Sequence, residues 1–298
     1  MCKNIKKNGN NKIFCLFFYK KNVFFLKKIM AQIKKDENTT QIKYPRIIMG
    51  LDVSTACIGV SIIADFGEGN PEIIKITHIS PKVSSKIKGT EALLLRKSIF
   101  ENEFLTTLKD IGITDVVIEE PLLSSNNAYT VGTLLKFNGM ICDSVYRIIG
   151  IVPNFISSYD ARTYSFPELM ALRKLNKKGE ELELSKIKKS IKDNHLVLFG
   201  AYPYDIDKKV IMMNKVNEMY PNIDWILNKN GEIKKENYDA CDSLVCALAY
   251  VNINRYGVEK PVITKSIVCQ NGDKPTEIQY TMEMWGKTFD RKIFINFS

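Results

Sequence analysis

Four acidic residues stand in apolar stretches of the sequence, where a charge is costly. Asp52 interrupts the apolar run that begins at Ile47, and Glu119 ends another short apolar run. Asp239 and Asp242 lie three residues apart in an Ala- and Leu-rich segment. Burying an ionised carboxylate costs several kcal/mol unless a metal ion or a hydrogen-bonding partner compensates. The four acids are therefore the residues whose types and spacing could do chemistry.

Each acid also has a structural explanation. Glu119 could pair with a lysine at a strand end, and Asp239 and Asp242 could stabilise the positive end of a helix dipole by about 0.3–1 kcal/mol each. Interaction with the helix dipole accounts for Asp239 better than for Asp242, because Asp242 would lie further inside an apolar helix. Positions i and i+3 share a helix face, so both carboxylates could converge on one point. Together the four acids indicate a site for two divalent ions about 4 Å apart, which is typical of phosphodiester cleavage.

The cysteine and histidine content argues against a zinc site. There are seven cysteines with no CxxC pair, and His78 and His195 have no cysteine at ligand spacing. In a chain without a clear secretion signal, these cysteines are expected to be reduced thiols. Carboxylates bind hard cations, so the expected cofactor is Mg²⁺, with Mn²⁺ as a substitute and two ions per site.

The elements that must position the acids follow an α/β pattern. Apolar periodicity predicts strands and helices in alternation. The strands are expected as a hairpin over about 47–64 and at 73–79, 115–121 and 152–157, and the helices over 88–109, 129–149, 207–219 and 238–252. This order predicts a mixed-sheet α/β domain. Glu119 would end its strand at the functional edge, with Glu120 on the opposite face. Gly139 is expected to mark close packing of its helix against the sheet.

The net charge of +10 lies mostly outside this pattern. Residues 1–29 hold eight lysines and no acid, which leaves about +2 for the rest of the chain. The basicity is therefore weak evidence for a nucleic-acid partner. Residues 1–45 are expected to be a disordered basic arm, or residues 1–29 are not translated at all. Their apolar pieces are too short to span a bilayer, no small-residue cleavage site follows, and the expected location is cytoplasmic.

Two segments do not fit the simple domain. Residues 172–192 contain eight basic and three acidic residues, which is compatible with a solvated helical hairpin or with an arm that contacts phosphates. The tail has β-like runs at 262–268, 278–284 and 292–297. The first segment is interpreted as part of a helical insertion over about 165–199. The tail is interpreted as a C-terminal β-rich extension over 258–298.

Over about residues 46–255, the order and spacing of motifs resemble RuvC-type Holliday-junction resolvases of the ribonuclease-H-like superfamily. The matching motifs are Ile48-Met49-Gly50-Leu51-Asp52-Val53-Ser54, Val117-Ile118-Glu119-Glu120-Pro121, Leu134-Leu135-Lys136-Phe137-Asn138-Gly139-Met140, Asp207-Lys208-Lys209-Val210 and Asp239-Ala240-Cys241-Asp242-Ser243-Leu244. The family's simple turn is missing at the insertion, which leaves the preference for a DNA structure open. The Lys-, Asn- and Ile-rich composition would suit a viral member from an AT-rich genome.

The resemblance implies a fold, a reaction and a set of site residues. The fold is a ribonuclease-H-like mixed sheet flanked by helices, in a nuclease domain over 46–257. The reaction is metal-dependent hydrolysis of branched DNA, here a four-way junction, by a homodimer. The implied catalytic and metal-binding residues are Asp52, Glu119, Asp239 and Asp242. The residues expected to contact DNA are Lys208, Lys209, Lys136 and Ser54.

Three other functions are considered. A related nuclease could act on flaps, replication forks or RNA–DNA hybrids. An actin- or sugar-kinase-like ATPase also opens with a Gly-x-Asp strand, but the sequence lacks a second acid-bearing phosphate loop and a Gly-rich adenosine site. A non-catalytic junction-binding protein would not need all four acids, and all four are present.

Overall fold

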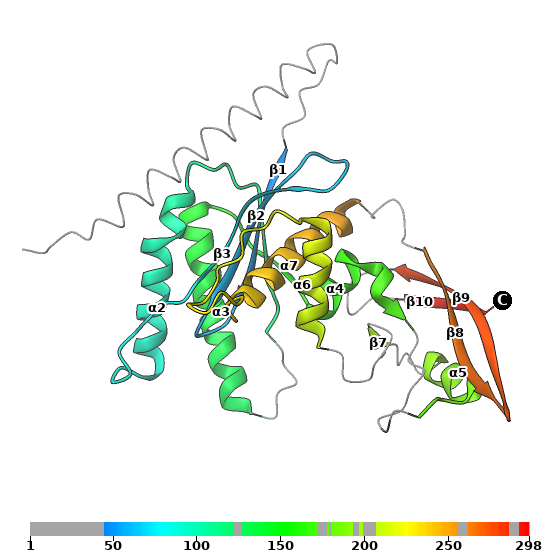
Figure 1. Ribbon diagram of the computed structural model, residues 1–298. Coiled ribbons are helices and arrows are strands. Elements are labelled where there is room, and N and C mark those ends of the chain that lie inside the picture. The colour runs from blue at the N-terminus through cyan, green and yellow to red at the C-terminus, as the bar shows by residue number, and fades with distance from the viewer. Residues whose placement is uncertain are drawn as a thin grey trace, which may run out of the picture. The chain divides into compact units, whose positions relative to one another are not determined.

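A mixed sheet of five strands carries two of the predicted acids (Figure 1). The structure is a computed structural model that describes residues 45–121, 127–171, 178, 180–192, 197–198, 207–255, 262–285 and 292–297. The strands are β1 (Arg46–Val53), β2 (Ile58–Asp65), β3 (Glu72–Ile79), β4 (Asp115–Glu119) and β5 (Asn154–Ile156). Their order is β3-β2-β1-β4-β5. β1 to β3 pair antiparallel, whereas β4 is parallel to β1 and β5 to β4. This arrangement is that of the ribonuclease-H-like fold, so the predicted fold class is confirmed.

The central strands are buried on both faces. β2 is buried along its whole length, and Ile48, Met49 and Leu51 of β1 are fully buried. Strands covered on both faces read as continuous apolar runs rather than as alternating ones. This is why β1, β2 and β4 could be located from the sequence to within about two residues.

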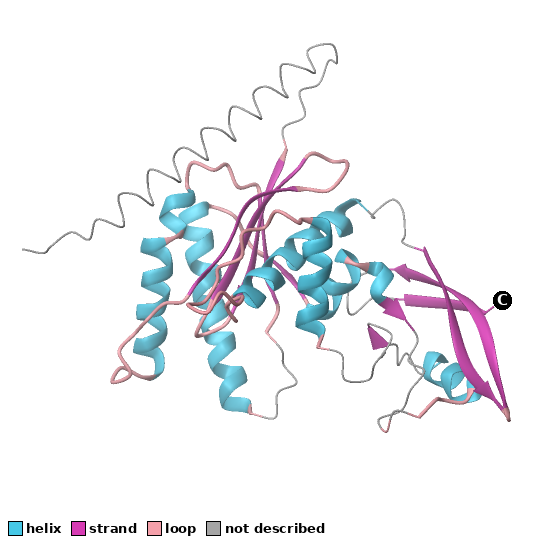
Figure 2. Ribbon diagram, in the orientation of Figure 1, coloured by secondary structure: helices cyan, strands magenta, loops and turns pink. Residues whose placement is uncertain are grey.

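Helices cover both faces of the sheet (Figure 2). On one side lie α2 (Gly89–Glu103) and α3 (Ala128–Ile149), and on the other lie α4 (Ser158–Ser165), α6 (Lys208–Met219) and α7 (Asn237–Arg255). α7 packs directly on β1 and β2, and α4 and α6 pack on α7. The Asp207 side chain caps α6 by accepting hydrogen bonds from the backbone N–H groups of Lys209 and Val210.

Two local predictions were wrong. The expected helix over 88–109 is not continuous, because the backbone leaves the helical region at Phe104 and a 3₁₀ turn, η1 (Leu105–Leu108), follows α2. Gly139 does not mark a close approach either. A Cβ atom added there would meet no atom within 4 Å, because Gly139 lies on an exposed part of α3.

The insertion and the tail pack against each other. The insertion contains η2 (Pro167–Leu169), β6 (Met170–Ala171), α5 (Leu184–Lys192) and β7 (Val197–Leu198), and the tail forms an antiparallel sheet of β8 (Val262–Asn271), β9 (Lys274–Trp285) and β10 (Lys292–Phe297). α5 lies on β8, and Ile187 is 1% exposed in a cluster with Ile263 and Ile267. The Gln270 side-chain amide donates a hydrogen bond of 3.1 Å to Glu181. These elements are called the outer layer below.

Some predictions lie outside the described residues. The basic arm predicted over 1–45 is outside them except for Pro45, as is much of the lysine-rich part of the insertion before α5. Among the residues that the structure describes, no helix is both long enough and apolar enough to span a membrane.

Candidate metal centre

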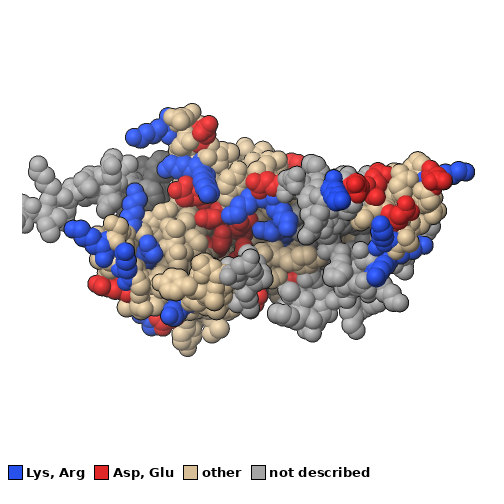
Figure 3. Space-filling model, turned by 90° about the horizontal axis from the view of Figure 1, so that it is seen from below, with Lys and Arg blue, Asp and Glu red and all other residues tan. Residues whose placement is uncertain are grey.

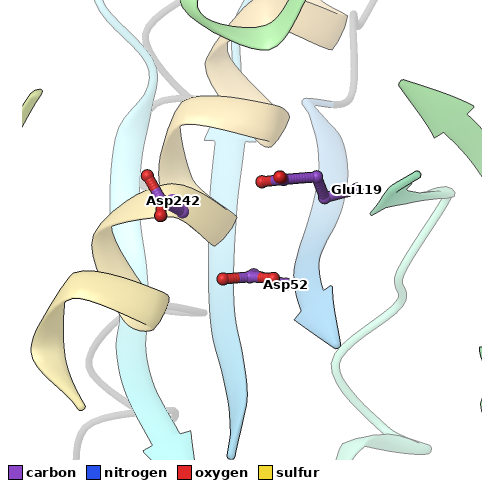
Figure 4. Close-up of side chains that lie close together, drawn as sticks. All are labelled: Asp52, Glu119 and Asp242. Atoms are coloured by element: carbon purple, nitrogen blue, oxygen red, sulfur yellow. The ribbon is translucent and has the colours of Figure 1, made fainter. Parts of the chain in front are cut away.

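Three of the four predicted acids come together at one edge of the sheet. Asp52 is the second-to-last residue of β1, Glu119 ends β4, and Asp242 lies near the start of α7. One carboxylate oxygen of each lies within 4.8 Å of one oxygen of both others. Figure 4 shows Asp52 and Glu119 reaching from their two strands toward the turn of α7 that carries Asp242.

The strand register places the first two acids together. β1 and β4 are parallel, and Leu51 is paired with Ile118. The next residue of each strand is therefore the acid, and the carboxyl ends of parallel strands meet at the same edge of a sheet. Glu120, one residue further, is not among the three converging acids.

Two glycines let α7 come close enough to add the third acid. An ideal Cβ on Gly59 would lie 1.9 Å from the backbone oxygen of Asp239, and one on Gly50 would lie 2.1 Å from the backbone oxygen of Ser243. Both distances are far below contact, so only glycine fits at these points. Gly59 is also the cross-strand partner of Asp52. The position of α7 relative to Asp52 is thus set by backbone packed on backbone.

The three converging carboxyls hold their protons more tightly than ordinary acids. Burial, and next the nearby charges of Glu119 and Asp242, raise the pKa of Asp52 well above its usual value. Burial and the charge of Asp242 raise the pKa of Glu119 to about 7. Burial raises the pKa of Asp242, although the Lys209 and Arg162 charges oppose the shift. Such clusters occur at functional sites, where a bound cation removes the repulsion.

The fourth predicted acid, Asp239, is not part of this group. Its Oδ1 is 3.3 Å from the Lys209 ammonium, which also lies 3.5 Å from Oδ2 of Asp242. Lys209 therefore stands beside the acids, at the start of α6. Figure 3 shows acidic side chains gathered in the middle of one face with basic side chains at their border.

The other predicted DNA contacts lie in different settings. Lys208 and Lys136 are exposed, on α6 and α3. The Ser54 hydroxyl donates a 2.8 Å hydrogen bond to the Cys57 carbonyl and accepts one of 3.0 Å from the Cys57 N–H. In this structure that hydroxyl closes the turn between β1 and β2.

Three neighbours of the acids were not found from the sequence. Arg162 of α4 lies near enough for its charge to lower the pKa of Glu119 and Asp242, and nothing in its local sequence sets it apart. Gly59 had a usable signal, since a glycine inside a strand pattern indicates close backbone approach. The third neighbour is Cys246, whose Sγ lies 3.9 Å from Oε2 of Glu119.

The residues present fit a hard divalent cation. Two oxygens bound to Mg²⁺ at about 2.1 Å lie at most about 4.2 Å apart, so the three carboxylates need only small rotations to share one ion. The Cys246 thiol donates to Glu119 and is not among the ligand atoms that converge. The donor set is then oxygen alone, which suits Mg²⁺ or Mn²⁺.

Comparison with known proteins gave matches only among solved structures. No protein-family model and no curated protein matches the sequence. Thermus thermophilus RuvC has a TM-score of 0.43 at 14% identity, with 71% of this chain and 96% of that chain covered. RuvC of the same organism in complex with a Holliday junction substrate has a TM-score of 0.40 at 13% identity, covering 72% and 97%. The yeast mitochondrial Holliday junction resolvase has a TM-score of 0.39 at 12% identity, covering 72% and 80%. The strand order described above is what identifies the fold.

Proposed function

We propose that this protein is a metal-dependent endonuclease that hydrolyses phosphodiester bonds in branched DNA, with the four-way junction as its substrate. The observation that carries the proposal is the convergence of Asp52, Glu119 and Asp242 from three elements far apart in sequence. Their pKa values are raised by burial and mutual repulsion, and the nearby charges of Lys209 and Arg162 offset only part of this. The motifs similar to RuvC-type resolvases support branched DNA as the substrate class.

In the proposed mechanism, two Mg²⁺ ions would be held by Asp52, Glu119, Asp239 and Asp242. Asp52 would be shared by both ions, Glu119 would hold one of them, and Asp239 with Asp242 would complete the coordination. The bound ions would activate water and stabilise the leaving oxygen. The protein itself orients the DNA strand, and Lys208 contacts a phosphate without reading the base sequence. Products with a 3′-hydroxyl and a 5′-phosphate are those that the family resemblance implies.

Resolution of a four-way junction also requires a second active site. Two symmetric cuts are made when two copies of the site are related by a two-fold axis, so a homodimer is part of the proposal. We place the reaction in the cytoplasm, where DNA is accessible, and in a host cytoplasm if the protein is a viral member of the group.

The experiment is cleavage of a panel of labelled substrates by the purified protein. The panel consists of a four-way junction, a flap, a fork, an RNA–DNA hybrid and a linear duplex, each with Mg²⁺, with Mn²⁺ and with a chelator. Cleavage of the junction in preference to the others, and only with a divalent ion, is the expected result. Preference for the flap, fork or hybrid would favour the related nuclease, and ATP hydrolysis without cleavage would favour the ATPase.

Asp52→Asn is the decisive variant. Loss of a metal ligand is expected to reduce the cleavage rate by more than about 100-fold. Mutation of a residue that only supports a metal ligand already reduces metal affinity or activity by up to about 100-fold. Glu120→Gln is the matched control, because it removes a carboxylate one residue from Glu119 but outside the converging group. Equal cleavage by Asp52→Asn and wild-type protein would refute the assignment.

A further inference from the structure

The Lys209 ammonium pairs with Asp239, the predicted acid that lies outside the converging group. It lies 3.3 Å from Oδ1 of Asp239 and 3.5 Å from Oδ2 of Asp242. Its backbone is fixed at the start of α6, where Asp207 caps the helix and Met212 and Val216 are buried. The contact with both acids is therefore a property of how α6 packs on α7.

This ammonium divides the four acids into two sets. Asp52, Glu119 and Asp242 face one another, whereas Asp239 faces Lys209 and is absent from the converging group. Asp242 belongs to the first set although its Oδ2 also lies 3.5 Å from the ammonium. One divalent ion can bind to the first set while the ammonium keeps its contact with Asp239. A second ion that uses Asp239 would have to take the place where the ammonium now stands.

We propose that Lys209 occupies the second cation position of the site in the DNA-free protein, so that this position takes a divalent ion only after the ammonium leaves. The inference rests on the proposed function, since it assumes that the acids bind metal. Lys209 already does part of the work of an ion, because its charge lowers the pKa of Asp52, Glu119 and Asp242 against the effect of burial.

Electrostatic repulsion prevents the Lys209 ammonium and a second divalent ion from occupying this position together. A monovalent and a divalent cation a few ångströms apart repel each other strongly, and more so in a partly desolvated site than in water. Lys209 can leave, because its side chain is 47% exposed and lysine has a flexible stem. A DNA phosphate offers the ammonium another partner. Loading of the second ion and binding of DNA are then coupled, and each favours the other by the same factor.

The test measures uptake of Mn²⁺ alone, without DNA, by titration calorimetry and by electron paramagnetic resonance of the free ion. Wild-type protein is expected to bind one ion per chain at low Mn²⁺. Lys209→Met is expected to bind a second ion at a concentration at least about tenfold lower than wild type does. Lys209→Gln serves in the same way if the methionine variant does not fold, and thermal melting checks both variants.

Two controls test whether the effect depends on a positive charge at position 209 itself. Lys208→Met removes the same charge one residue away, from an exposed side chain with no described contact to the acids, and should bind Mn²⁺ as wild type does. Lys209→Arg keeps the charge and should also behave as wild type.

The inference fails if Lys209→Met and Lys209→Gln bind Mn²⁺ with the stoichiometry and affinity of wild type, or if wild type already binds two ions without DNA. Either result leaves the cleavage assay and the proposed function untouched. If no variant takes up any ion, the proposed function fails together with the inference.

Discussion

The sheet centre, made of β1, β2, β4 and α7, and the outer layer are held together in different ways. In the sheet centre, the backbone of α7 packs on Gly50 and Gly59, and the converging acids are buried although their charges repel one another. In the outer layer, α5 packs an apolar face on β8 through ordinary side chains such as Ile187. The first region tolerates almost no added atom, whereas the second depends on burial that many apolar residues could supply. The site proposed to hold cations thus has a stiffer setting than the layer around it.

The largest effect is expected at Gly59. In Gly59→Ala, the new Cβ would overlap the backbone of Asp239, which cannot rotate away as a side chain could. We expect a loss of about 3 kcal/mol or more in the free energy of unfolding, together with loss of Mn²⁺ uptake. Chemical denaturation and titration calorimetry measure the two effects.

Gly139→Ala is the matched control for that variant. It adds the same atom to an exposed position of α3 with no neighbour within 4 Å, and should stabilise the protein by about 0.5–1 kcal/mol. If Gly59→Ala were as stable as wild type, the comparison between a stiff centre and a tolerant layer would be wrong.

An intermediate loss of stability is expected for two cavity-forming variants, one in the sheet centre and one in the outer layer. Ile118→Ala in β4 and Ile187→Ala in α5 each empty a fully buried position, for which about 2–5 kcal/mol is typical. Ile118 precedes Glu119, so its loss should also weaken Mn²⁺ uptake. Ile187→Ala should leave Mn²⁺ uptake unchanged, and limited proteolysis should show cleavage first in the outer layer. Weaker uptake in Ile187→Ala would show that the layer helps to position the acids.

The smallest expected effect is a pH dependence of the free energy of unfolding, which arises from the buried acids of the sheet centre. The pKa of Glu119 is raised to about 7 in the folded protein, above the value of an unfolded glutamate near 4.3. Between these values the folded state binds more protons than the unfolded state, so the free energy of unfolding falls as pH rises, and it levels off above about pH 7. Denaturation in a chelator at pH 5 and pH 8 measures this fall. Glu119→Gln or added Mg²⁺ should reduce it, and an unchanged slope in Glu119→Gln would assign the pH dependence to other groups.

The sheet centre was largely predictable from the sequence. Burial on both faces gives β1, β2 and β4 long apolar runs, so an acid within or at the end of such a run stands out. The i, i+3 spacing placed Asp239 and Asp242 on one face of α7. The spacing could not show that Lys209, 30 residues earlier than Asp239, would pair with both of them, because that depends on how α6 packs on α7.

Other errors have local physical causes. The apolar spacing continues through Leu105 and Leu108, so the pattern did not reveal that α2 ends before Phe104. Glycine alone does not distinguish a close contact from open space, and Gly59 and Gly139 are opposite cases. The packing of the insertion on the tail joins α5 to β8 across many residues, and amphipathic patterns do not name their partners.

The glycine contacts of α7 have a consequence for how such sites diverge. The spacing between Asp52 and the α7 acids is fixed by main-chain atoms, which are the same whatever the sequence. Core side chains around them can therefore be exchanged for others of similar volume without changing the geometry of the site. A short pattern of Gly50, Asp52, Gly59, Glu119, Asp239 and Asp242, with Lys209 beside the last two, would describe the site better than overall sequence identity does.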